Sequence, residues 1–222
     1  MFRRYGIYFV PDGPLGKHGA AWLGWDITRG CAAAHPQIDG LDIASLTRRP
    51  RKYGLHATLK PPMVLAQDRT LSEFIDALGQ TAKLLPAASL DGLDVTRVGS
   101  FLALTAWGDQ TAVNDLAAKL VTSLDRFRAP LAPDEVARRR KRALTPSQER
   151  NLLHWGYPNV MDDFQFHITL TGSVKNAVSI HPTVAAHFAP VLPTPLTIDH
   201  LTLVGEDGEG MFHALERMPL LG

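Results

Sequence analysis

The chain has 222 residues, of which 45% are hydrophobic and 20% are charged. This apolar content excludes a disordered chain, and no run of residues approaches the roughly 18 apolar positions that a membrane span needs. Cys31, the single cysteine, has no partner for an intrachain disulfide, and the N-terminus lacks the apolar region of a signal peptide. We therefore expect a cytoplasmic globular protein with no membrane partner.

Charge is nearly balanced, with 23 Lys and Arg against 22 Asp and Glu, but the cations are clustered. A first basic segment occupies residues 48–52, around Pro50, and a second is the unbroken run Arg138–Arg142. Local positive charge on a neutral chain favours an anionic ligand over general adhesion to nucleic acid. The second run is equally typical of a solvated helix face, so its role stays open.

The hydrophobic pattern predicts a mixture of strands and helices. Two helix starts are marked by capping-box spacing, Thr70 with Glu73 and Thr145 with Gln148. In chain order we expect a strand at 5–10, a turn at 11–14, helical structure at 20–34, a strand at 53–60, a helix at 70–85, hairpin strands at 93–98 and 101–107, a helix at 113–127, a short helix at 134–142, a helix at 145–155, a strand at 164–172, a helix at 183–188, and hairpin strands at 196–204 and 211–217.

The two halves of the chain repeat one order of elements: a strand with a histidine, a helix, then a two-stranded hairpin. The histidine strands match as apolar, His, small or apolar, Thr, Leu, at residues 55–59 and 166–170. They lie about half a chain length apart. This repetition predicts an internally duplicated, two-lobed α+β fold whose histidine strands are related by a pseudo-twofold axis.

The repeated motif places reactive side chains on one face of each strand. Residues i and i+2 of a strand project from the same face, so His56 lies beside Thr58, and His167 beside Thr169. A neutral histidine can accept a proton from a nucleophile while a protonated one donates to a leaving oxygen. Threonine hydroxyls can hydrogen-bond phosphate oxygens where charge develops. Such a quartet suits phosphodiester chemistry without a metal.

A lone His-x-Thr sequence on a strand is most often an ordinary half-buried histidine; the repetition in matching context favours the functional interpretation. Five other histidines lack that context, His18, His35, His181, His187 and His213. His154, beside Trp155, and His200, on a late strand that could face the cleft, are more typical of structural residues. No HExxH-like or HxHxDH-like cluster is present, so we expect neither a metal nor a cofactor.

At these motifs the chain resembles the two-histidine (2H) phosphoesterase superfamily, the LigT-like and cyclic phosphodiesterase group. Residues 51–62, 155–158 and 164–172, together with 21–24 and 144–148, resemble the branch found with phosphonate-utilisation operons. The resemblance spans about residues 4–217. It implies one bilobal LigT-like domain over residues 1–222, with antiparallel sheets lining a central cleft, helices outside, and motif strands near 55–60 and 164–171.

The resemblance also implies hydrolysis of a cyclic phosphate, with 5-phosphoribosyl 1,2-cyclic phosphate opened to ribose 1,5-bisphosphate as the expected reaction. Lys60 follows Thr58 by two positions on the expected strand, and Arg51 precedes the motif, so both are candidates for a second phosphate. Three aromatic residues are candidates to shape the sugar pocket: Tyr5, Trp155 and Tyr157.

Two alternatives remain open. In the first, the chain is a phosphodiesterase of RNA or nucleotide 2′,3′-cyclic phosphates, and Arg138–Arg142 follow the RNA backbone. In the second, it is a non-catalytic module that binds phosphate or RNA. We rank nucleic acid second to a small phosphorylated sugar or nucleotide, because aromatic residues do not interleave with the basic run. The sequence does not indicate which histidine is the acid, nor an oligomeric state.

Overall fold

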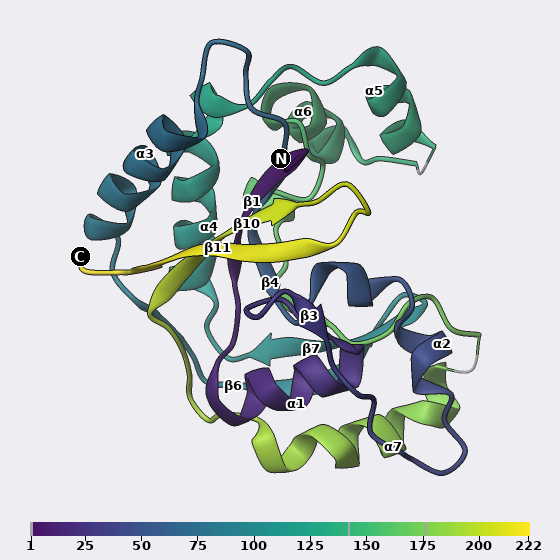
Figure 1. Cartoon of the computed structure of the whole chain (residues 1–222). Helices are drawn as coiled ribbons and strands as arrows, with labels where there is room; N and C mark the ends of the chain where they lie inside the picture. Colours follow the sequence, from purple (N-terminus) through teal and green to yellow (C-terminus); the bar gives the residue numbers. More distant parts are fainter. Residues whose placement is uncertain (1, 142, 176) are drawn as a thin grey trace.

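The computed structural model describes residues 2–141, 143–175 and 177–222. Its main element is one seven-stranded sheet in which every neighbouring pair is antiparallel, in the order β11-β10-β1-β4-β8-β7-β6 (Figure 1). Two small two-stranded sheets, β2–β3 and β5–β9, lie outside it. The strands are β1 (Arg4–Phe9), β2 (Trp25–Asp26), β3 (Cys31–Ala32), β4 (Ala57–Met63), β5 (Ala88–Leu90), β6 (Gly92–Val98), β7 (Phe101–Trp107), β8 (His167–Thr169), β9 (Leu196–Ile198), β10 (His200–Glu206) and β11 (Phe212–Pro219).

The two halves of the chain interlock within this sheet. The histidine strands β4 and β8 are direct neighbours at its centre, so the sheet runs without interruption from one half to the other. The β6–β7 hairpin follows β4 in sequence but pairs beside β8, and the β10–β11 hairpin follows β8 but pairs beside β1. The predicted duplication is therefore present as an exchange of hairpins between halves.

Helices form where the sequence supplies periodic apolar residues and caps. Both predicted capping boxes exist, at Thr70 with Glu73 and at Thr145 with Gln148. The α-helices are α1 (Gly13–Leu23), α2 (Ile43–Thr47), α3 (Leu71–Lys83), α4 (Thr111–Ser123), α5 (Pro133–Arg140), α6 (Pro146–Trp155) and α7 (Ala177–Phe188), with 3-10 turns η1 (Pro50–Tyr53), η2 (Asp125–Phe127), η3 (Met161–Asp163) and η4 (Ala189–Val191). Among the described residues, no helix is both long and apolar enough to cross a membrane.

Several expected elements differ from the structure. The strand expected at 53–60 begins only at Ala57, after η1, and continues through Pro61 and Pro62 to Met63. The strand expected at 196–204 is divided into β9 and β10, which belong to different sheets. The helix expected at 20–34 is wrong: α1 occupies Gly13–Leu23, and Gly24 ends it in the left-handed conformation with φ 76°. The helix expected at 183–188 begins earlier, at Ala177, because Pro182 is accommodated inside α7 rather than preceding it. The strand expected at 164–172 is paired only over His167–Thr169.

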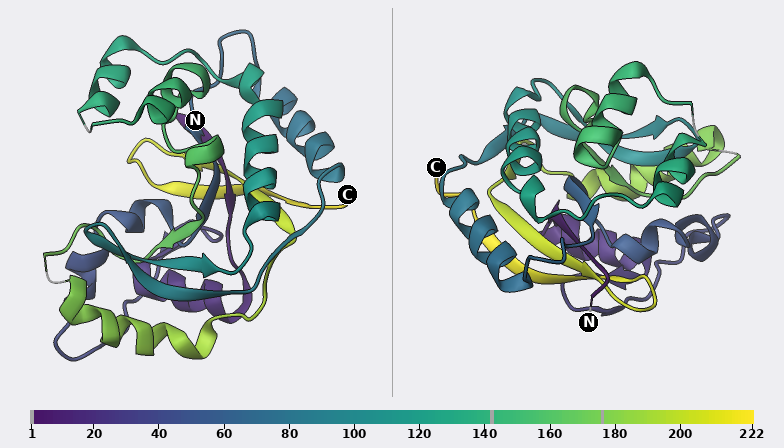
Figure 2. Two further views of the ribbon diagram at one scale, coloured as in Figure 1. Left: turned by 180° about the vertical axis from the view of Figure 1, so that it is seen from behind. Right: turned by 90° about the horizontal axis from the view of Figure 1, so that it is seen from above.

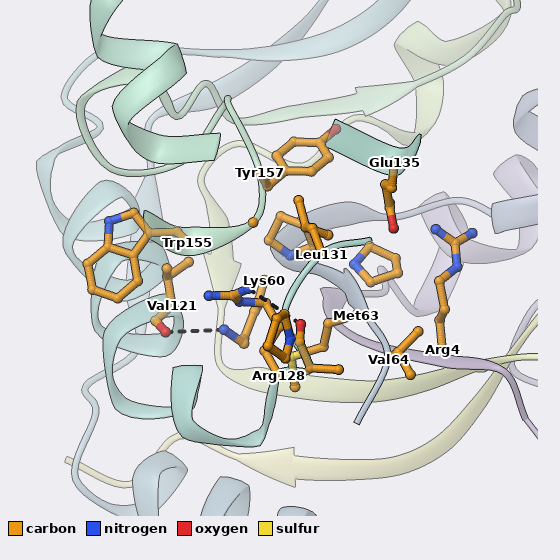
Figure 3. Close-up of a pocket in the computed structure, with 15 residues that line it drawn as sticks. Arg4, Lys60, Met63, Val64, Val121, Arg128, Leu131, Glu135, Trp155 and Tyr157 are labelled. Atoms are coloured by element: carbon orange, nitrogen blue, oxygen red, sulfur yellow. Dashed lines mark hydrogen bonds between the residues drawn. The ribbon is translucent and has the colours of Figure 1, made fainter. Parts of the chain in front are cut away.

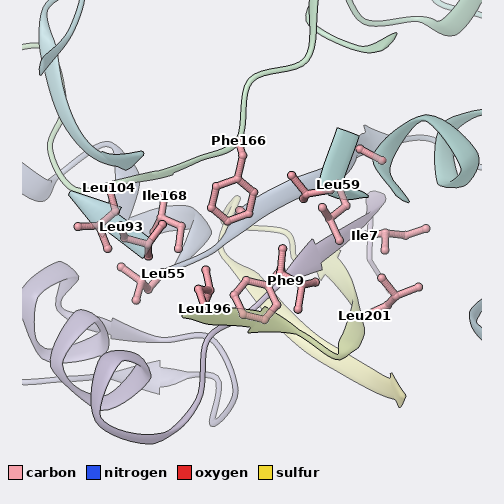
Figure 4. Packing of buried hydrophobic residues seen from close by; sticks show 14 of the residues in the cluster. Ile7, Phe9, Leu55, Leu59, Leu93, Leu104, Phe166, Ile168, Leu196 and Leu201 are labelled. Carbon is pink, nitrogen blue, oxygen red and sulfur yellow. The ribbon is translucent and has the colours of Figure 1, made fainter. Parts of the chain in front are cut away.

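The main core lies on one face of the sheet. Figure 4 shows Ile7 and Phe9 of β1 packed with Leu59 of β4 and Ile168 of β8, and all four are at most 3% exposed. Because strand side chains alternate, Tyr8 of β1 belongs to the opposite face. Figure 2 shows α3 and α4 at one end of the molecule, and α1 and α7 at the other.

Candidate functional site

The two His-x-Thr motifs meet at the centre of the sheet. Ala57 of β4 is paired with Ile168 of β8 in an antiparallel register. Continuing that register sets His56 opposite Thr169, and Thr58 opposite His167. Ala57 and Ile168 are buried on the core side, so the two histidines and two threonines share the other face of the sheet, which we call the histidine face. The structure therefore brings all four residues together.

Both imidazoles are oriented by the same backbone contact. Nδ1 of His56 lies 2.9 Å from the carbonyl oxygen of Gly54, and Nδ1 of His167 lies 2.8 Å from that of Gln165. A carbonyl oxygen only accepts hydrogen bonds, so Nδ1 carries the hydrogen in each ring. Nε2 is then the atom of each neutral ring with a lone pair available for proton transfer.

Gly54 is required for this geometry at the first motif. Its φ is 66°, a left-handed value that favours glycine. A Cβ atom at this position would lie 2.6 Å from Cβ of Ile27, well inside contact distance. Only glycine therefore allows the chain to turn out of η1 and present its carbonyl to His56.

His56 is the more enclosed of the two histidines. The ring of Tyr8 stacks on it with centroids 3.8 Å apart and an interplanar angle of 20°. Nε2 of His56 lies 3.0 Å from Oγ1 of Thr58, close enough to accept a hydrogen bond from that hydroxyl. Burial lowers the pKa of His56 to about 4, aided by the charge of His167, while the Gly54 carbonyl acts in the opposite direction. The ring is consequently neutral at pH 7.

His167 lacks an equivalent cover. Its strand is paired with β7, which sets Thr105 opposite His167 and Ala103 opposite Thr169. Tyr8 is opposite Thr58 in the other half, so Ala103 occupies the position that corresponds to Tyr8. The nearby ring of Phe101 is 6.1 Å from His167 and tilted by 52° rather than stacked. The two motifs therefore match in sequence but differ in surroundings.

Two of the residues expected to bind substrate lie away from the histidine face. Tyr5 is 8% exposed and belongs to the main core, where its ring meets Phe2 edge-on. Lys60 does not share the face of Thr58, so that expectation is wrong. A register shift in β4 pairs Thr58 with Tyr8 but Lys60 with Ile7, whose side chain lies in the core. Such an irregularity redirects the following side chain.

Lys60 instead lines a pocket beside the sheet. It is 3% exposed, and its Nζ donates a hydrogen bond of 3.1 Å to the backbone carbonyl of Val121 in α4 (Figure 3). Burial lowers the pKa of its ammonium group to about 8. Trp155 and Tyr157 line the same pocket, so the structure brings three of the predicted binding residues together there.

Tyr157 and Arg4 connect this pocket to the histidine face. Both act on the phenol of Tyr8, whose pKa is raised chiefly by burial. Arg4 and Tyr8 are four residues apart on β1, so their side chains lie on the same face of the strand. Arg4 donates two hydrogen bonds to Glu206, at 2.5 and 2.8 Å.

The two basic segments have different partners. In α5, Arg138 and Arg139 pair with Glu135, and Arg140 pairs with Glu149. Arg139 also lies over the Tyr157 ring, 4.8 Å from its centroid. Arg142 lies outside the described residues. These contacts neutralise much of the second run and favour its interpretation as a structural helix face.

The first basic segment has no such neutralisation. Within the described part of the chain, no acidic side chain pairs with Arg48, Arg49, Arg51 or Lys52. The backbone beside this segment touches the end of the second motif strand, because Gly172 donates a 2.7 Å hydrogen bond to the Leu46 carbonyl. The chain next to this segment therefore lies beside Gly172, three residues beyond Thr169.

Tyr8 and Tyr53 are the site residues that the sequence patterns do not reveal. The ring of Tyr53 is 6.2 Å from His56 and packs on Phe212, as Tyr8 also does. Alternation along β1 separates Tyr8 from Tyr5, but it does not show which face carries the histidines.

Within the described residues, no group of three or more His, Cys, Asp and Glu side chains is arranged to hold a metal ion.

The fold is similar to that of solved LigT-like phosphoesterase structures. A crystal structure described as a phosphoesterase aligns over 100% of both chains, with TM-score 0.50 and 15% identity. E. coli LigT complexed with phosphate aligns over 100% of this chain and 99% of its own, also with TM-score 0.50 and 15% identity. The fold that the sequence resemblance implied is confirmed.

The chain belongs to the family described as protein of unknown function (DUF1045), whose model matches residues 58–213. Two curated relatives are named ribose 1,5-bisphosphate phosphokinase PhnN. The one from Janthinobacterium sp. (strain Marseille) is 34% identical over 99% of this chain and 51% of its own length. The one from Laribacter hongkongensis (strain HLHK9) is 29% identical over 97% and 51%. The chain spans about half the length of these relatives.

Proposed function

We propose that this protein hydrolyses a cyclic phosphodiester by acid–base catalysis, with His56 and His167 as the proton-transfer groups. The proposal rests chiefly on the antiparallel Ala57–Ile168 pair, because it sets two oriented imidazoles and two hydroxyls around one position on the histidine face. Proton transfer requires groups that reach the reacting atoms directly or through one water, and both Nε2 atoms belong to this face. The proposal requires no metal and no cofactor.

The reaction needs two proton transfers. One imidazole takes a proton from water through Nε2 while the water oxygen bonds to phosphorus. The phosphorus–oxygen bond of the ring breaks, and the departing oxygen receives a proton from the other imidazole. The products are one phosphate monoester and one hydroxyl, and solvent restores both histidines. Thr58 and Thr169 donate hydrogen bonds to the non-bridging phosphate oxygens as negative charge grows there.

The substrate that we propose is 5-phosphoribosyl 1,2-cyclic phosphate, opened to ribose 1,5-bisphosphate during phosphonate catabolism. Supporting this choice, the curated relatives are named as kinases of ribose 1,5-bisphosphate, and this chain corresponds to about half of their length. The proposed hydrolysis produces ribose 1,5-bisphosphate, which a kinase of that name consumes, so the two activities would act in sequence if they were joined in one chain. We propose that residues 1–222 form one bilobal domain with this activity. The sheet that runs without interruption through both halves supports a single domain.

The second phosphate of this substrate needs a cation near the histidine face. We propose Arg51 for it, since it belongs to the unneutralised segment 48–52, which directly precedes the first motif, and since the adjacent Leu46 accepts a hydrogen bond from Gly172, three residues beyond β8. Trp155 and Tyr157 are proposed to border the sugar, because both line the pocket to which Arg4, on the Tyr8 side of β1, also contributes. An RNA substrate is less favoured, because the arginines of α5 that would follow a backbone are engaged by Glu135 and Glu149. The cytoplasmic location stays a prediction.

Phosphorus NMR tests the proposal. The purified protein is incubated with 5-phosphoribosyl 1,2-cyclic phosphate in EDTA, beside an equal sample of 2′,3′-cyclic AMP. We expect the cyclic-phosphate signal to disappear in the first tube and the reaction to be abolished by His56→Ala and by His167→Ala. Turnover of the nucleotide alone would overturn the substrate, and hydrolysis in a parallel sample without EDTA but not in EDTA would overturn the metal-free mechanism. No reaction in either tube would count against cyclic phosphate hydrolysis.

A further inference from the structure

The contact between Tyr8 and His56 distinguishes the two histidines. Tyr8 is 1% exposed, and its ring lies parallel to the imidazole at stacking distance. In the other half, Ala103 stands at the corresponding position and provides no ring for His167. A pair of otherwise symmetric motifs therefore contains one aromatic face, directed at one imidazole.

An aromatic face attracts positive charge. The face of an aromatic ring carries partial negative charge, and a cation within about 6 Å of its centroid is stabilised. The imidazole of His56 lies inside that distance and is neutral in the resting protein. It becomes positive only when it accepts a proton. Tyr8 consequently interacts more strongly with the product of proton transfer than with the resting state, which is the condition for lowering a barrier.

Burial creates the need for such a contact. Removal of water lowers the pKa of His56 to about 4, which keeps the ring neutral but also makes it a weak base. The titratable side chains around it are Tyr8 of β1 and Tyr53 of η1, whose rings contact it, and His167 of β8, whose charge lowers its pKa. None of these is a carboxylate. The Tyr8 ring is thus the neighbour suited to support an imidazolium.

We propose that Tyr8 is a positioning residue that holds His56 as the base and stabilises its imidazolium form, leaving His167 to protonate the departing oxygen. This inference rests on the proposed function. Water gives a proton to Nε2 of His56 as its oxygen bonds to phosphorus, and Nε2 of His167 gives a proton to the departing ribose oxygen. Thr58, which faces Nε2 of His56 in the resting protein, turns its hydroxyl to the phosphate when the substrate binds.

Substitutions at position 8 separate the charge of the ring from its shape. Tyr8→Phe keeps the face, Tyr8→Leu removes it, and Phe101→Leu is the matched control near His167. We expect NMR titration to give a His56 pKa that is unchanged in Tyr8→Phe and Phe101→Leu, but lower by about half a unit to one unit in Tyr8→Leu. We expect kcat to fall about tenfold in Tyr8→Leu with KM little changed, and to fall less in Tyr8→Phe, which keeps the ring face.

Fluorination provides a test that does not depend on tolerance of leucine. Pentafluorophenylalanine at position 8 reverses the charge of the ring face at nearly constant shape, so both the His56 pKa and kcat should fall relative to phenylalanine. Equal values in the two proteins would overturn the role of Tyr8, even if hydrolysis is intact. Absence of hydrolysis in the wild type would overturn the proposed function, while the NMR titration would still decide whether Tyr8 stabilises the imidazolium.

Discussion

Ala57 of β4 and Ile168 of β8 form the antiparallel pair around which the two histidine motifs are arranged. Both residues are at most 1% exposed, so the pair anchors the core on one side of the sheet while its neighbours occupy the other. One backbone register therefore fixes the relative positions of two imidazoles and two hydroxyls. A single-residue slip would exchange the two faces of a strand and separate these groups.

Replacing either histidine tests whether both are needed. We expect His56→Ala and His167→Ala each to lower kcat for a cyclic phosphate by about 100- to 10,000-fold, because each removes one proton-transfer group. His181→Gln is the control, since His181 bonds the Val95 carbonyl away from the motifs. Phosphorus NMR measures the rates, and circular dichroism checks folding. A folded His167→Ala protein with wild-type activity would contradict the two-histidine mechanism.

Replacing the threonines tests their role toward phosphate. Thr58→Val and Thr169→Val keep the shape of the side chain but remove the donor, so we expect kcat to fall by about 100- to 1,000-fold. Thr105→Val is the comparison: Thr105 lies opposite His167 but belongs to neither motif. Single-turnover kinetics separate chemistry from binding. If all three variants lose the same small factor, the motif threonines have no special part in the reaction.

The sequence predicted the centre of this site well, because the period of a strand determines which side chains share a face. His56, Thr58, His167 and Thr169 needed only that rule and the repeat of the motif. Lys60 failed the same rule because of the register shift in β4, which has no signature in its residue types. Tyr8 was missed because stacking on His56 depends on how β1 pairs with β4, a long-range relation that local patterns do not encode.

The unneutralised basic segment predicts a selective effect on substrate binding. We expect Arg51→Gln to raise KM for 5-phosphoribosyl 1,2-cyclic phosphate by about tenfold or more, with less effect on 2′,3′-cyclic AMP, which lacks a terminal phosphate. Arg138→Gln serves as the matched control, because Arg138 is an exposed cation that pairs with Glu135. Equal KM increases for both substrates in both variants would indicate general electrostatic attraction instead.

Replacing the buried Lys60 with an apolar residue should stabilise the folded protein, because it removes a buried charge. The ammonium is protonated in both states at pH 7, so the folded protein bears the full cost of its burial there. We expect Lys60→Met to raise the free energy of unfolding at pH 7 by about 1–2 kcal/mol after loss of the bond to Val121. Since the folded pKa is about 8 and the ordinary pKa of a lysine is 10.5, this advantage should shrink across that pH range. Urea unfolding at pH 7 and pH 10 measures it, with exposed Lys17→Met as control.

The lowered pKa of His56 should make the free energy of unfolding depend on pH in the acid range. Its folded pKa is about 4 and the ordinary pKa of a histidine is 6.5, so between these values the unfolded chain binds more protons than the folded one. The free energy of unfolding should therefore fall as the pH is lowered through this window, with a slope approaching about 1.4 kcal/mol per pH unit from this residue. His56→Asn removes the titration and should flatten that part of the curve. Urea midpoints for the two proteins at pH 7, 5.5 and 4.5 give the comparison. Parallel curves would show that the His56 imidazole is not kept neutral by folding, and would remove the basis for its role as the base.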